Sequence, residues 1–142
     1  MKRLTLVLVL LFMSCSDDDN HSGYISNCDV IAQKPERTYF NQIDTSNYTI
    51  TDVQLSGDCL EVSISASGCD ANTWDINLFG VDSFFNSTIP GREMKVELIN
   101  TQTCLTVISK TISFDLLPYQ EDNIDALLLI IESWSENVIY DY

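Results

Sequence analysis

Five cysteines are the residues of this 142-residue chain with the clearest capacity for chemistry. They are Cys15, Cys28, Cys59, Cys69 and Cys104. Cys15 follows a short apolar run, and the four that remain are an even number, which in an oxidising compartment predicts disulfide bonds. Four cysteines allow three pairings, and their positions alone do not choose among them. A zinc site is the alternative, but no two of these cysteines have the close C-x2-4-C spacing that structural zinc sites favour.

The only histidine, His21, lies in a polar stretch near the amino terminus. Nucleophilic catalysis needs a base beside a serine or cysteine, and this histidine is poorly placed to be one. The 21 acidic residues could supply a pair of carboxylates for glycoside hydrolysis. In so acidic a chain, however, some carboxylates would lie at a suitable separation by chance. We therefore expect no catalytic residue, no metal ion and no cofactor.

The charge of the chain restricts its partners. The formal net charge is −14, with only seven lysines and arginines scattered along the sequence. Loss of an amino-terminal leader containing Lys2 and Arg3 would remove two positive charges and give −16. Phosphate backbones are bound by clusters of basic side chains, so we expect no nucleic-acid partner.

The first fourteen residues have the pattern of a secretory signal. Lys2 and Arg3 precede an apolar run from Leu4 to Met13 that only Thr5 interrupts. Ten helical residues rise roughly 15 Å, which is half of a hydrocarbon core of about 30 Å. A basic start followed by so short an apolar run predicts a cleaved signal over residues 1–14.

The residues around Cys15 resemble the lipobox of bacterial lipoproteins, because the small Ser14 stands directly before it. The resemblance implies that Cys15 is lipidated and becomes the amino terminus, and several acyl chains would hold a membrane durably. The acidic run that follows resembles the export signal of Bacteroidota lipoproteins, which implies display on the outer face of the outer membrane. That signal consists of Ser16, Asp17, Asp18 and Asp19. A solvated tether would have the same composition.

The rest of the chain divides into a polar tether over residues 15–46 and a folded domain over residues 47–142. Apolar and polar residues alternate with period two in most of the domain, which is typical of half-buried strands. We expect strands at Tyr48–Leu55, Leu60–Ala66, Trp74–Leu78, Met94–Leu98, Cys104–Phe114, Ala126–Ile131 and Val138–Tyr142. The run Ala126–Ile131 is apolar throughout and also has some helical propensity, but its position favours a closing hairpin. About seven strands predict an all-β fold, an antiparallel β-sandwich of immunoglobulin-like general architecture.

Three stretches of the domain resemble a group of small, uncharacterised Bacteroidota surface lipoproteins. They are SGDCLEVSISASGCDANTW, KVELIN and ISFDL, within Val53–Leu117. The resemblance supports fold and location and implies no activity. It places a cysteine at Cys69 and at Cys104, and both also lie near expected strand ends, so we predict that these two pair. Cys28 then remains for Cys59.

These observations predict a lipid-anchored protein of the outer membrane, on the cell surface, that acts as a non-catalytic binding or accessory module. The alternatives are a carbohydrate-binding module of a glycan-uptake system and a carboxylate-based hydrolase. Trp134, in a predicted turn, is the candidate ligand-binding residue because its ring could stack on a sugar, although covering the hairpin edge is the more common role for such a residue. Trp74 is expected in the core. The expected partners are the membrane, through the lipid, and an envelope protein or a glycan.

Overall fold

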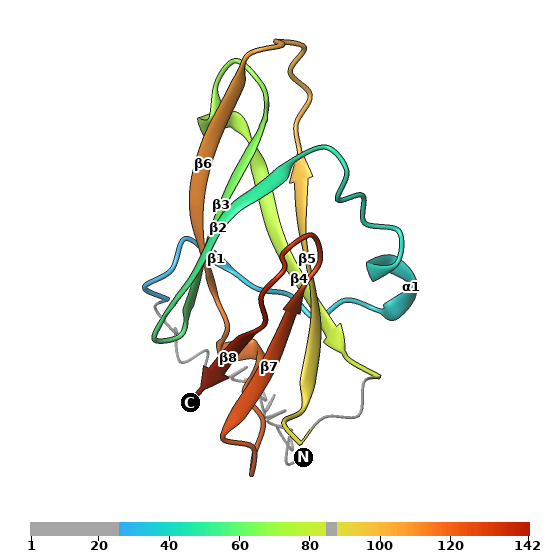
Figure 1. Ribbon diagram of the computed structural model, residues 1–142, viewed down its shortest axis with the longest axis vertical. Helices are drawn as coiled ribbons and strands as arrows, with labels where there is room; N and C mark the ends of the chain where they lie inside the picture. The colour runs from blue at the N-terminus through green and yellow to red at the C-terminus, as the bar shows by residue number, and fades with distance from the viewer. Residues whose placement is uncertain (1–25, 85–87) are drawn as a thin grey trace, which may run out of the picture.

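The computed structural model describes residues 26–84 and 88–142, which form a mostly β structure with very little helix (Figure 1). The strands are β1 (Val30–Ile31), β2 (Thr49–Ser56), β3 (Cys59–Ser67), β4 (Asp75–Asp82), β5 (Gly91–Ile99), β6 (Val107–Asp115), β7 (Ala126–Ile131) and β8 (Val138–Asp141). One short helix, α1 (Arg37–Phe40), and two 3-10 turns, η1 (Ala71–Thr73) and η2 (Leu117–Tyr119), complete the described elements. The all-β expectation is therefore confirmed at this level, with eight strands where about seven were expected.

The strands form two four-stranded sheets, with the orders β1-β6-β3-β2 and β4-β5-β7-β8. Hairpins join β2 to β3, β4 to β5 and β7 to β8, and each of these pairs is antiparallel. Both sheets are nevertheless mixed, because β1 runs parallel to β6 and β5 runs parallel to β7. The expectation of a purely antiparallel arrangement is wrong for a topological reason. The chain leaves the second sheet after β5, passes through β6 in the first sheet and returns as β7, and such a long crossover permits a parallel pair.

The period-two pattern of the sequence places one face of each strand in a core shared by the two sheets. In β3, Leu60, Val62 and Ile64 are fully buried, whereas Glu61 points to solvent. Leu78 of β4 and side chains of β5, β6, β7 and β8 belong to the same cluster. The apolar run Ala126–Ile131 is a strand whose residues alternate between buried and half-buried positions, so its helical propensity is overridden by pairing with both neighbours.

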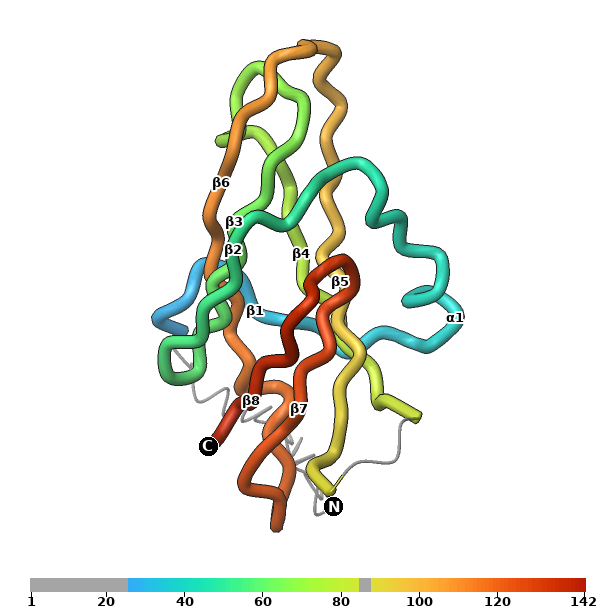
Figure 2. Tube along the Cα trace, viewed as in Figure 1, coloured from blue at the N-terminus to red at the C-terminus, as the bar shows by residue number. Residues whose placement is uncertain are grey.

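The segment Val30–Gln33, which we call the strap, connects the two sheets. Val30 and Ile31 pair with β6 in the first sheet, and the Ala32 amide donates to the Asp115 carbonyl at 3.0 Å. Gln33 then pairs with β4 in the second sheet, where its amide donates to the Leu78 carbonyl at 2.9 Å. The tube in Figure 2 shows this blue segment passing from β6 across the molecule towards α1.

The strap and α1 show that residues 30–43, which were expected to belong to the tether over residues 15–46, pack against the two sheets. Phe40 and Ile43, on and after α1, are buried against Phe79 and Val81 of β4, and Ala32 lies in the main core. The sequence does not reveal this packing, because the buried residues of the stretch are few and follow no strand or helix period. The backbone hydrogen bonds of the strap hold it to both sheets. The expected signal peptide, the lipidated Cys15 and the export signal lie outside the described residues. No helix in the described part of the chain is long and apolar enough to cross a membrane.

Candidate functional site

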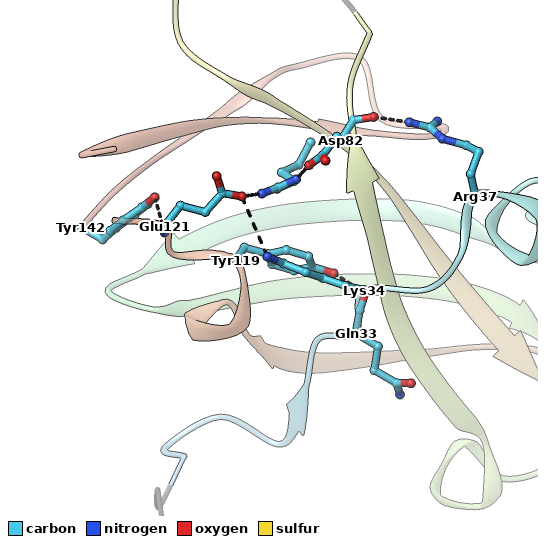
Figure 3. Close-up of polar contacts among 8 residues, drawn as sticks. Gln33, Lys34, Arg37, Asp82, Tyr119, Glu121 and Tyr142 are labelled. Carbon is cyan, nitrogen blue, oxygen red and sulfur yellow. Dashed lines mark hydrogen bonds and ion pairs between the residues drawn. The ribbon is translucent and has the colours of Figure 1, made fainter. Parts of the chain in front are cut away.

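An open cavity of about 280 Å³ lies where the strap leads into α1, beside the end of β4. We call it the strap cavity. It is lined by Lys34, Pro35, Arg37, Gly80, Val81, Asp82, Phe84 and Arg92. Figure 3 shows the polar contacts around it, with Lys34 and Arg37 on one chain segment and Asp82 at the end of β4.

The fold brings basic residues together here that are far apart in the sequence. Only five lysines and arginines lie after residue 14 of the sequence, and three of them, Lys34, Arg37 and Arg92, line the strap cavity. Lys34 directly follows the strap, Arg37 is the first residue of α1, and Arg92 is the second residue of β5. Because β5 pairs with β4, Arg92 lies opposite Asp82. The grouping depends on strand register and could not be read from local spacing.

Arg92 is the buried cation of the site. Only 5% of its side chain is exposed, and its guanidinium forms ion pairs with Asp82 and Glu121. The guanidinium carbon lies 5.8 Å from the centre of the Tyr119 ring, within the range of a cation–π contact. The Nε atom is also buried and has no hydrogen-bond partner among the described residues. A buried donor of this kind is costly unless something satisfies it.

Lys34 is the more accessible cation. Its Nζ lies 3.9 Å from Glu121 Oε1 and 5.6 Å from the centre of the Tyr119 ring. Figure 3 shows Glu121 between Lys34 and Tyr142, whose hydroxyl accepts a hydrogen bond from the Glu121 amide. Burial lowers the pKa of Lys34 from its ordinary value, and the positive charge of Arg92 lowers it further. Burial and the charge of Arg92 thus both disfavour the protonated form of Lys34.

Arg37 closes the site on the α1 side. Its Nη1 donates to Glu93 Oε2 at 2.5 Å, and its Nη2 donates to the backbone carbonyl of Asp82. The guanidinium carbon also lies 4.6 Å from the centre of the Phe84 ring. Phe84 is 83% exposed, so this cation–π contact holds an aromatic ring at the mouth of the cavity.

Tyr119 lies next to two of the cations, Lys34 and Arg92. Its ring is fully buried, and its hydroxyl donates to the Gln33 carbonyl at 2.6 Å, which ties η2 to the strap. Burial raises the pKa of Tyr119, although the charge of Arg92 opposes the rise. Gly80 leaves room for this ring, since a Cβ there would lie 2.8 Å from the Tyr119 hydroxyl. A glycine on β4 is therefore a packing requirement of the site.

The residues singled out by the sequence lie elsewhere. The structure pairs Cys28 with Cys59 and Cys69 with Cys104, which are the two disulfide bonds that the sequence analysis predicts. Trp74 is buried in the core, as expected. Trp134 lies in the turn between β7 and β8, half-buried against the core, and lines none of the cavities described for this structure. No group of three or more metal-ligating side chains occurs in residues 26–84 and 88–142.

Comparisons with known proteins bear on the fold. No family model and no curated protein matches the chain. Two solved structures do. A Bacteroides caccae protein described as a NigD-like immunity protein has a TM-score of 0.55 and 11% identity, over 78% of this chain and 58% of that one. A Bacteroides vulgatus protein of unknown function, DUF1344, has a TM-score of 0.49 and 17% identity, over 80% of this chain and 55% of that one. This chain thus spans little more than half the length of either, and the first likeness concerns the fold alone.

Proposed function

We propose that the protein is a lipid-anchored component of the cell envelope, displayed on the outer-membrane surface, that binds a ligand without transforming it. The signal-like residues 1–14, the lipobox-like Ser14-Cys15 pair and the acidic run after it support the anchor and its location. The two disulfide bonds support residence in an oxidising compartment.

The observation that carries the binding role is the strap cavity. Its lining combines hydrogen-bond donors, one carboxylate acceptor and an exposed aromatic ring, with Asp82 on β4 and Arg92 on β5. Binding sites typically have a few convergent polar groups against an apolar wall. Arg92 is held by two carboxylates and Tyr119 by the strap, so these groups are positioned before a ligand arrives. Preorganisation of this kind reduces the entropic cost of binding.

The two-sheet architecture also fits a binding module of immunoglobulin-like general architecture, which we include in the proposal. The chain enters each sheet more than once, as strands do in Greek-key sandwiches. Such sandwiches commonly present binding residues at their ends, where the loops gather.

The anchor and the binding role have separate tests. Metabolic labelling with a fatty-acid analogue should mark the wild-type protein and leave Cys15→Ala unmarked, and equal labelling of both would refute the anchor. Protease treatment of intact cells should cut the wild type and spare a variant with alanines at Asp17, Asp18 and Asp19. A glycan array probed with the Cys15→Ala chain tests the binding role, with Lys34→Met beside it. A hit that requires Lys34 supports the strap cavity as the binding site, and no hit on a broad array argues against glycan recognition.

A protein partner is the second candidate, because one solved structure of this fold is described as an immunity protein. The observation that favours it is an apolar tip beside the Cys69–Cys104 bond, where Leu105 is 92% exposed and Val107 is 68% exposed. Exposed apolar groups on a stapled loop suit a protein interface. Cells that express the wild type or Leu105→Asp can be challenged with spent media from related strains. Protection by the wild type alone would support this candidate, and equal survival would refute it.

A further inference from the structure

We propose that the strap cavity recognises a single hydroxylated monocarboxylate unit, the chemistry of a uronic acid residue in an acidic glycan. This inference rests on the proposed binding function and specifies its ligand class. It depends on three features of the cavity: unmet donors, balanced charge, and acceptors beside an aromatic ring.

Two nitrogen donors at the cavity have no hydrogen-bond acceptor in the described part of the chain. Arg92 Nε is buried and unpaired, although its side chain lines the cavity. The nearest carboxylate oxygen recorded for Lys34 Nζ is Glu121 Oε1, which at 3.9 Å lies beyond hydrogen-bonding distance. Both cations also lie near the Tyr119 ring, Lys34 Nζ at 5.6 Å and the Arg92 guanidinium carbon at 5.8 Å from its centre. A carboxylate has two oxygens with several lone pairs, so in the cavity it can accept from Lys34 Nζ directly and from Arg92 Nε once the atoms that cover this nitrogen move.

The balance of charge disfavours a ligand with two negative charges. Three cations at the site face three carboxylates, those of Asp82, Glu93 and Glu121. The site is therefore close to neutral, and it belongs to a chain with a formal net charge of −14. A phosphate would bring about two negative charges and meet more repulsion than a carboxylate. The structure thus favours a monoanion over a phosphate group.

A carboxylate of the site can also accept hydrogen bonds from the ligand. Asp82 lines the cavity and is 83% exposed at its side chain, so it retains an oxygen that can accept from a hydroxyl group. A polyhydroxylated ring with one carboxylate supplies acceptors and donors together. The exposed ring of Phe84 adds an apolar face at the mouth, and a cavity of about 280 Å³ is at the small end for ligand sites, which suits one sugar unit.

The test is a titration of the full chain carrying Cys15→Ala with four probes. Binding is measured by the changes in amide chemical shifts in NMR spectra. The probes are D-galacturonate, D-galactose, N-acetylglycine and inorganic phosphate. A ligand of this size is expected to bind with a Kd of about 1 mM. We expect galacturonate to shift the amides of Lys34, Gly80 and Arg92, and galactose to bind at least fivefold more weakly.

Two lysine variants locate the effect. Lys34→Met should weaken galacturonate binding about tenfold, whereas Lys110→Met on β6, which changes the net charge equally, should leave it unchanged. Equal loss in both variants would overturn the assignment, since it would reflect the overall charge and not the site. Tighter binding of N-acetylglycine or phosphate, or shifts with none of the probes, would also overturn it. If the array detects a neutral glycan that requires Lys34 while galacturonate fails, the proposed binding function stands and this inference fails. If both experiments find nothing, both fail.

Discussion

Replacing Gly80 with alanine should destabilise the protein, although the same change usually stabilises a strand. Alanine loses less backbone entropy on folding than glycine, which favours the substitution by roughly 0.5–1 kcal/mol. The added Cβ, however, would lie 2.5 Å from Met94 Sδ and 2.9 Å from Tyr119 Cζ. Overpacking of this kind costs roughly 1–3 kcal/mol in a dense core.

Tyr119 makes the clash difficult to relieve. Its ring is fully buried and its hydroxyl donates to the Gln33 carbonyl, so a shift of the ring would weaken a bond worth about 1 kcal/mol. Met94 is flexible at its thioether but is also fully buried, so it has little space to move. The steric cost therefore exceeds the entropic gain, and we expect Gly80→Ala to lower the free energy of unfolding by about 2 kcal/mol.

Urea denaturation monitored by tryptophan fluorescence measures this change, and a double-mutant cycle with Met94→Ala tests its cause. Met94→Ala alone should cost roughly 2–5 kcal/mol through the space it leaves. If the two side chains collide, the double variant should be more stable than the sum of the single effects by at least about 1 kcal/mol. A neutral or stabilising Gly80→Ala, or additivity within about 0.5 kcal/mol, would refute the packing argument.

Three further predictions concern stability. Replacing Cys28 and Cys59 with alanine should cost about 3.7 kcal/mol on the chain-entropy model for a 31-residue separation, measured by urea denaturation, and two free thiols in the unreduced wild type would contradict the bond. Tyr140→Phe should cost roughly 1.5–3 kcal/mol, because the buried hydroxyl donates to Asp58 Oδ1 at 2.7 Å, and an unchanged urea midpoint would refute this. Hydrogen bonds from Ser113 hold the pKa of Asp29 below its ordinary value of 3.8, so this carboxylate stabilises the fold above that pH and the contribution is lost as the pH falls through the lowered pKa. The stability advantage of the wild type over Asp29→Asn should therefore shrink below about pH 4, and a constant difference would count against it.

The strands could be predicted from the sequence because period-two alternation directly reflects a sheet with one buried face. Leu60, Val62 and Ile64 show this most clearly. The parallel pairing of β5 with β7 could not be predicted, since alternation reports the face of a strand and not its neighbour. Alternation also misses the strap, which is too short to show a period.

The strap cavity could not be predicted from the sequence either, because its residues are distant along the chain. Lys34 and Arg92 are 58 positions apart and meet only because the strap pairs with β4 and β4 pairs with β5. The sequence shows the basic residues as scattered, and scattering in sequence does not imply scattering in space. Trp134 was predicted as a ligand-binding residue because it is aromatic and lies in a turn, but its side chain is partly buried and packs against the core.

The Cys28–Cys59 bond determines how the domain responds to mechanical load. A pulling force applied to the chain ahead of Ser26 reaches Cys28 before it reaches the strap, and the covalent bond passes it directly to the start of β3, an inner strand of its sheet. The strap, held to β6 by a parallel pairing of only two residues, then bears little of the tension. With the bond reduced, the same force would peel these few hydrogen bonds one after another and pull Gln33 away from β4. With the disulfide bond formed, the force is therefore carried by an inner strand of a sheet and not by the short pairing of β1 with β6.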